Sequence, residues 1–115
     1  MPWLPILLML GQPAPPAPPN AIFMFETGAS LLAKCRNRAP EYRLACTAYI
    51  VGAVDGIKRE AFQGRPLTNC WPAQIPAEEV RRIVVSYLER TVSEHGAPAS
   101  VLVGVALDER FPCRG

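Results

Sequence analysis

Four cysteines are the residues of this sequence with the clearest chemistry, because a thiol can form a disulfide, ligate a metal or act as a nucleophile. They are Cys35, Cys46, Cys70 and Cys113. A zinc site is disfavoured, because the spacings between these cysteines do not form paired CxxC knuckles. Two disulfides are the better interpretation, and they indicate an oxidising compartment. Reduced, buried thiols are the alternative.

The other residues that could do chemistry do not form a catalytic set. His95, the only histidine, lies in Glu94-His95-Gly96, where an imidazole typically caps the C-terminal end of a helix. Asp55 and Glu60 could act as paired carboxylates only if they shared one face of a helix. They are five residues apart, which corresponds to about 500° of helical rotation, so they do not share a face. No GxSxG elbow, HExxH helix or glycine-rich phosphate loop occurs. We therefore expect a protein that is not an enzyme and that binds no metal or cofactor.

The composition disfavours two broad classes of function. The 115-residue chain holds 12 basic and 10 acidic side chains, a balance that does not suit a dedicated nucleic-acid arm. No apolar run approaches the roughly 18 to 20 residues needed to span a bilayer. We expect one compact domain, no nucleic-acid partner and no stable membrane insertion after processing.

The first 21 residues differ from the rest because they carry no charged side chain. A short apolar stretch at residues 3–10 precedes a proline-rich run at residues 13–19, a pattern typical of a secretory signal followed by a polyproline spacer. We therefore predict a signal peptide and spacer at residues 1–21, cleaved between Ala14 and Ala21, and a helical domain at residues 22–115. A disordered head or a misassigned start codon is the alternative.

Apolar periodicity predicts four helices in the rest of the chain. The first covers residues 27–35 with Thr27 as N-cap, and the second runs from about residue 42 to 62. The third begins after Pro76, follows its apolar pattern to Val92 and is closed by Gly96 and Pro98. The fourth, residues 99–110, is so apolar that we expect it to be buried on most sides. Its valines also fit a strand, but no hairpin turn flanks them.

The order of these helices suggests how the cysteines pair. Cys35 ends the first helix and Cys46 begins the second, so an antiparallel pair brings these thiols together. Cys70 precedes the third helix and Cys113 follows the fourth, which places them beside each other in the same way. Of the possible connectivities, this one needs no chain crossing. The predicted fold is therefore all-α: a compact bundle of four to five helices braced by two disulfides.

Small residues recur every four positions in the second predicted helix, at Ala48, Gly52 and Gly56. Each glycine costs about 1 kcal/mol relative to alanine in a helix interior, so we expect a compensating contact. Close approach of the fourth helix, which also holds alanine and glycine, is the simplest explanation. A groove that binds a partner is the alternative.

Basic residues cluster around the loop between the first two helices. The cluster is formed by Lys34, Arg36, Arg38 and Arg43. It could attract an acidic partner or a phospholipid surface, but an ordinary solvated loop is the favoured interpretation.

The succession of these segments resembles the Rap1a/Tai family of immunity proteins over residues 25–113. The resemblance is carried by TGASLLAKC, CTAYIVGAVDG, NCWP, VRRIVVSYLE and VLVGVALDERFPC. The matching motif positions are Cys35, Cys46, Tyr49, Ile50, Gly52, Asp55, Cys70, Pro72, Phe111, Pro112 and Cys113. The sequence departs from the family pattern in its atypical signal and at Pro76, where a serine or threonine cap is usual.

The resemblance implies a small exported helical protein with two disulfides, often a homodimer, that acts in the periplasm. Characterised members occlude the active-site cleft of a peptidoglycan amidase delivered by the type VI secretion system. A protruding loop would suit that task, and the chain offers residues 36–43, 63–69 and 93–98. The predicted partner-binding residues are Arg36, Arg38, Arg43, Glu94 and His95. The alternative is a periplasmic structural or stress-related helical protein, such as an HdeA-like acid chaperone.

Overall fold

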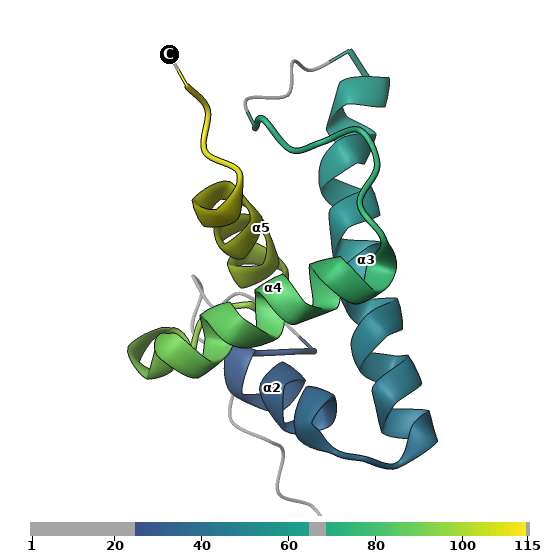
Figure 1. Ribbon diagram of the computed structural model, residues 1–115, viewed down its shortest axis with the longest axis vertical. Helices are drawn as coiled ribbons and strands as arrows, with labels where there is room; N and C mark the ends of the chain where they lie inside the picture. Colours follow the sequence, from purple (N-terminus) through teal and green to yellow (C-terminus); the bar gives the residue numbers. More distant parts are fainter. Residues whose placement is uncertain (1–24, 65–68, 115) are drawn as a thin grey trace, which may run out of the picture.

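A computed structural model describes residues 25–64 and 69–114 (Figure 1). Within these ranges the chain forms four α-helices and one short 3-10 helix, and no strand. They are α2 (Gly28–Arg36), α3 (Pro40–Phe62), α4 (Ala77–Arg90), η1 (Val92–Glu94) and α5 (Ala99–Arg110). The predicted all-α fold is confirmed. The predicted signal peptide and spacer lie outside the described residues, and so does most of the predicted loop at residues 63–69.

The first helix begins as predicted, because Thr27 and Ser30 form a capping box. The Thr27 hydroxyl accepts a hydrogen bond from the backbone N–H of Ser30 at 3.2 Å, and the Ser30 hydroxyl accepts one from the N–H of Thr27 at 2.9 Å. Two backbone donors that the helix leaves unpaired are thereby satisfied. The cap directs Leu31 and Leu32 into the core.

The second helix starts earlier than the sequence indicated. We expected this helix to begin at about residue 42, but Pro40 is the first residue of α3. Proline is tolerated there because the first helical N–H groups have no partner within the helix. The side chain of Asn37 accepts a hydrogen bond from the N–H of Ala39 at 3.0 Å and stabilises the turn just before it.

The helix after Pro76 is shorter than expected. It ends at Arg90, where the Thr91 hydroxyl donates a hydrogen bond to the carbonyl oxygen of Tyr87 at 2.7 Å, and the chain continues as η1. The hydroxyl satisfies a carbonyl that the helix end leaves without a partner.

The fourth predicted helix, now α5, has the expected bounds but not the expected burial. Leu102, Val103 and Leu107 are buried, whereas Val101 and Val105 are 55% and 41% exposed. The expectation of burial on most sides is therefore wrong. The helix packs against α4, α3 and α2 through one face, and no described element covers the other.

The core lies where α2, α4 and α5 pack against one side of α3, which α4 crosses (Figure 1). Its fully buried side chains include Leu31, Ile50, Leu88, Val103 and Leu107. These residues come from all four helices, so every helix contributes its apolar face to one core.

Two disulfides fasten the bundle with the connectivity expected from the helix order. Cys35 and Cys46 join the end of α2 to the start of α3, with their Cα atoms 5.0 Å apart. Cys70 and Cys113 join the segment before α4 to the chain after α5, with a Cα separation of 5.1 Å. Cys46 is fully buried, whereas Cys70 and Cys113 are exposed.

Candidate partner-binding surfaces

His95 and the four cysteines are engaged in structural contacts. A ring nitrogen of His95, Nε2, lies 2.6 Å from the carbonyl oxygen of Leu88, near the end of α4. This contact agrees with the helix-capping role that the sequence indicated for His95. The four cysteines are consumed in disulfides, so none of them offers a thiolate. The described residues also contain no group of His, Cys, Asp and Glu side chains that could hold a metal ion.

The segment between η1 and α5 is fastened to the start of α2. The N–H groups of Gly28 and Ala29 donate hydrogen bonds to the carbonyl oxygens of Ala97 and His95, at 3.1 and 3.0 Å. The N–H of Ala99 donates to the carbonyl oxygen of Glu26 at 3.0 Å. The predicted protruding loop at residues 93–98 is therefore a rigid corner, in which residues 92–94 and 96 are exposed.

Gly28 allows this close approach because it has no side chain. A Cβ atom built at this position would lie 2.6 Å from Cδ1 of Leu102 and 3.2 Å from the Cα of His95. Both separations are shorter than a normal contact between carbon atoms. Nothing in the sequence marks Gly28, because by residue type it is an ordinary first residue of a helix.

Most of the basic cluster around the α2–α3 loop is paired with acidic residues. Arg36 and Arg43 reach Glu89 and Glu78 on α4, each with an N–O distance of 3.0 Å. The loop is thus not an isolated positive patch, which favours the solvated-loop interpretation. Arg38 is exposed and has no ion pair among the described residues.

The fourth member of the cluster, Lys34, forms an ion pair with the buried Glu26. Ser30 donates a second hydrogen bond to Glu26, at 2.7 Å. Burial raises the pKa of Glu26, but the hydrogen bonds from Lys34 and Ser30, together with the charge of Lys34, outweigh it and hold the pKa below its usual value. This site was not predicted from the sequence, although Glu26, Ser30 and Lys34 are spaced four residues apart.

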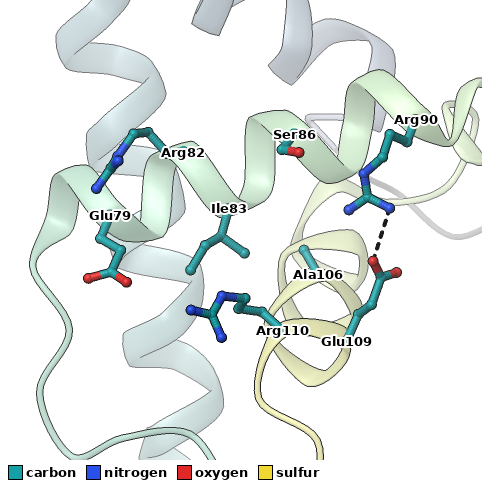
Figure 2. Close-up of a pocket in the computed structure, with 8 residues that line it drawn as sticks. All are labelled: Glu79, Arg82, Ile83, Ser86, Arg90, Ala106, Glu109 and Arg110. Atoms are coloured by element: carbon teal, nitrogen blue, oxygen red, sulfur yellow. Dashed lines mark ion pairs between the residues drawn. The ribbon is translucent and has the colours of Figure 1, made fainter.

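A hollow of about 440 Å³ forms a cleft between α4 and α5 (Figure 2). Its lining residues are Glu79, Arg82, Ile83, Ser86, Arg90, Ala106, Glu109 and Arg110. Arg90 and Glu109 form an ion pair of 3.0 Å across one end. Glu79, Arg82 and Arg110 lie toward the other end, with Ile83 between the two charged groups (Figure 2). Nothing in the sequence pattern marks this cleft, because its shape depends on how α4 and α5 pack against each other.

A comparison with known families matches residues 27–113 to the Rap1a immunity proteins. The match begins at the N-cap of α2, ends at Cys113, and therefore includes all four described helices and both disulfides. The chain belongs to the Rap1a immunity protein family. This membership supports an immunity role. Comparisons with curated proteins and with solved structures found no match.

The C-terminal Rap1a motif positions fasten the segment before α4 to the end of α5. Next to the Cys70–Cys113 disulfide, the indole N–H of Trp71 donates a hydrogen bond to Asp108 at 2.8 Å. Phe111 is half-buried against the core, and the guanidinium of Arg110 lies 4.9 Å from the centre of its ring. These contacts assign a structural role to this part of the motif.

Pro72 and Pro112, the two motif prolines, are exposed on either side of the same junction. Proline fixes the backbone φ angle, which reduces the freedom of the chain next to each cysteine.

The Rap1a motif positions on α3 lie on two different faces. Tyr49 is half-buried and packs against the core beside Ile50, whereas Gly52 and Asp55 are exposed. Asp55 lies at the edge of a smaller hollow of about 230 Å³ between α3 and the segment before α4. In the same hollow, Lys58 donates a hydrogen bond to the carbonyl oxygen of Ala73 at 3.5 Å.

The small-residue stripe of α3 does not pack against the fourth helix. A Cβ atom built at Gly52 or Gly56 would meet no atom within 4 Å, and Ala48 is exposed with them. The expected close approach at these glycines is therefore wrong. The two helices touch on another face, where a Cβ at Gly104 would lie 3.4 Å from Cδ1 of Ile57.

No described helix of this Rap1a protein is both long and apolar enough to cross a membrane.

Proposed function

We propose that this protein is a periplasmic immunity protein that binds a peptidoglycan amidase effector of a type VI secretion system and blocks its active-site cleft. The observation that carries the proposal is the Rap1a family match over residues 27–113. In this role the protein acts by binding and performs no catalysis.

The structure supports a role in binding because the exposed surfaces are held by rigid elements. The two disulfides and the backbone hydrogen bonds at Gly28 and Ala29 restrain the ends of the helices and the corner after η1. A restrained surface loses little conformational freedom when a partner binds, so more of the contact energy appears as affinity. Of the predicted binding residues, Arg38 and Glu94 are exposed without an ion pair in the described ranges.

The decisive experiment is co-expression with candidate peptidoglycan amidases directed to the periplasm. The intact protein is expected to rescue growth, whereas a version without residues 1–21 is expected not to, because it stays in the cytosol. The two cell populations should contain equal amounts of the immunity protein. A pull-down with a catalytically inactive amidase tests direct binding, and lack of both rescue and a complex across the candidates would overturn the proposal.

The proposed export can be tested without any partner. Osmotic-shock fractionation should place the protein in the periplasmic fraction, and the intact mass should correspond to cleavage between Ala14 and Ala21 with both disulfides formed. Four free thiols in a cytoplasmic fraction would contradict the proposal.

The proposed assembly is a homodimer, as is common in the family. Light scattering coupled to size-exclusion chromatography measures the mass of the purified protein directly. A mass equal to one chain over a wide concentration range would rule out this part of the proposal.

If the protein instead binds hydrophobic dyes and prevents aggregation at about pH 2 to 3, the acid-chaperone alternative would be favoured.

A further inference from the structure

The cleft between α4 and α5 contains more positive charge than its own acidic residues neutralise. Arg90 and Glu109 pair with each other at one end. At the other end Arg82 and Arg110 stand near the carboxylate of Glu79, and Arg82 also feels the charge of Glu78, but neither arginine has an ion pair among the described residues (Figure 2). By contrast, Arg36, Arg43 and Arg81 each bind a carboxylate on α4.

The unpaired guanidinium of Arg110 is restrained before any ligand arrives. It lies over the ring of Phe111 at 4.9 Å, a favourable cation–π geometry. Phe111 is half-buried and lies two residues before Cys113, which is held by the disulfide to Cys70. A cation that is held in this way loses less side-chain entropy on binding than a free arginine.

The cleft also offers apolar surface next to the charges. Ile83 projects from α4 between the two charged ends, and Ala106 lies opposite on α5 (Figure 2). A ligand that combines a carboxylate with an aliphatic stem would satisfy both kinds of surface. Glutamate and aspartate side chains in a loop next to an apolar residue have this chemistry.

A phosphate group suits the cleft less well than a carboxylate does. Glu79 repels a doubly charged phosphate more strongly than a singly charged carboxylate.

We propose that the α4–α5 cleft binds an acidic segment of a partner protein, with one carboxylate between Arg82 and Arg110 and the stem of that side chain on Ile83. Arginine suits this contact because its planar guanidinium binds carboxylates through two parallel hydrogen bonds. The inference rests on the proposed function only in naming the amidase effector as the partner. The preference of the cleft for a carboxylate is independent of it.

The first test titrates the intact, disulfide-bonded protein with a blocked pentapeptide that has one central glutamate between leucines. The control is the same peptide with glutamine in place of glutamate. The side-chain Nε–H signals of Arg82 and Arg110 in nuclear magnetic resonance spectra should shift with the glutamate peptide only. Binding should weaken as salt is raised from about 0.01 to 0.15 M, because solvent-exposed charges are screened.

Variants of the cleft give the sharpest comparison. Arg82→Gln and Arg110→Gln should each lower the affinity for the glutamate peptide about two- to fivefold, the range for an exposed ion pair. Glu79→Gln should raise the affinity, because it removes the competing carboxylate. Arg114→Gln removes a positive charge outside the cleft and should leave the affinity unchanged. Backbone spectra that match those of the native protein establish that each variant is folded.

Three results would overturn the inference. The first is equal binding of the glutamate and glutamine peptides, and the second is an affinity that does not respond to the cleft variants. The third is tighter binding of inorganic phosphate than of the glutamate peptide, which would identify a phosphate site.

A second experiment measures the affinity for an inactive amidase that the protein neutralises. Loss of affinity in Arg82→Gln and Arg110→Gln supports the cleft as the contact, and an unchanged affinity overturns that role. Specific binding of the glutamate peptide without any amidase partner would support the cleft and count against the proposed function. The two proposals can therefore fail separately.

Discussion

At the start of α2, Glu26 and Gly28 fix the chain by opposite means. Glu26 is a buried carboxylate that Lys34 and Ser30 satisfy, whereas Gly28 admits the backbone of the segment after η1 because it lacks a side chain. Neither role follows from residue type, since glutamate is mostly exposed and glycine is unfavourable in helices. Both roles depend on what the fold places beside these residues.

The space around each glycine predicts opposite effects of the same substitution. Gly28→Ala should lower the free energy of unfolding by about 1–3 kcal/mol, because the new methyl group overlaps Leu102 and crowds His95. Gly52→Ala and Gly56→Ala should raise it by about 0.5–1 kcal/mol each, because both positions are open and alanine favours the helix. Urea unfolding with intact disulfides, followed by circular dichroism, measures all three. A stabilised Gly28→Ala variant would contradict the packing described at the start of α2.

The lowered pKa of Glu26 predicts a loss of stability in acid. Because the folded state favours the ionised carboxylate, its contribution is complete above about pH 5 and is lost as the pH falls through the folded-state pKa. Glu26→Gln should lower the free energy of unfolding by about 1–2 kcal/mol at neutral pH, and its difference from the native protein should shrink toward about pH 3. Urea unfolding across this pH range is the measurement, with the exposed Glu94→Gln as control. A difference that stays constant with pH would contradict the assigned role.

At the scale of the helices, the structure decides which faces are covered. In α3, Cys46 and Ile50 turn toward the core, and the stripe with Gly52 and Gly56 lies on the outer side. The sequence of α5 is apolar on most sides, but only one face of the helix packs against neighbouring helices. Arg36 and Arg43 of the basic cluster are paired because α4 brings two glutamates to them.

The same substitution at two valines of α5 tests which face of this helix is buried. Val103 is fully buried and Val105 is 41% exposed, although the two residues are only two positions apart in the same helix. Val103→Ser should lower the free energy of unfolding by about 2–4 kcal/mol, because it leaves a cavity and buries a hydroxyl. Val105→Ser should change it by no more than about 0.5 kcal/mol. Thermal and urea unfolding compare them directly, and equal losses would mean that α5 is covered on both sides.

For the whole molecule, the two disulfides supply a large share of the stability, because a core of this size contributes little by itself. They close loops with sequence separations of 11 and 43 residues, which in the chain-entropy model stabilise the fold by roughly 3 and 4 kcal/mol. Small domains have a total stability of about 5–15 kcal/mol, so loss of both bridges removes much of it. This dependence agrees with the proposed function in an oxidising compartment.

Reduction is expected to act on the two bridges in order. The exposed Cys70–Cys113 disulfide should be reduced first by a mild thiol reductant, because the attacking thiolate can reach it, while Cys35–Cys46 is shielded by the buried Cys46. Full reduction should then unfold most of the protein at about 37 °C. Alkylation with mass spectrometry identifies the order, and circular dichroism follows the unfolding. A fully reduced protein that keeps its native stability would contradict the structural role of the bridges.

The sequence by itself determined the positions of the helices, the cap at Thr27 and the pairing of the cysteines. The helices and the cap are local features, because helix periodicity, caps and proline depend on residues within a few positions of each other, and the pairing of the cysteines follows from the order of the helices. It did not place the C-terminal end of α4 or the start of α3 correctly, since single hydrogen bonds and the tolerance for proline in a first turn set those limits.

Only the tertiary structure decided which side of each helix is covered. Periodicity shows that α3 and α5 have apolar faces, but the neighbours of those faces come from distant parts of the chain. The exposure of Gly52, the tight space at Gly28 and the charge of the cleft at Arg82 and Arg110 all depend on such neighbours. Contacts between different helices depend on how the helices pack in three dimensions, and the local sequence pattern does not predict them.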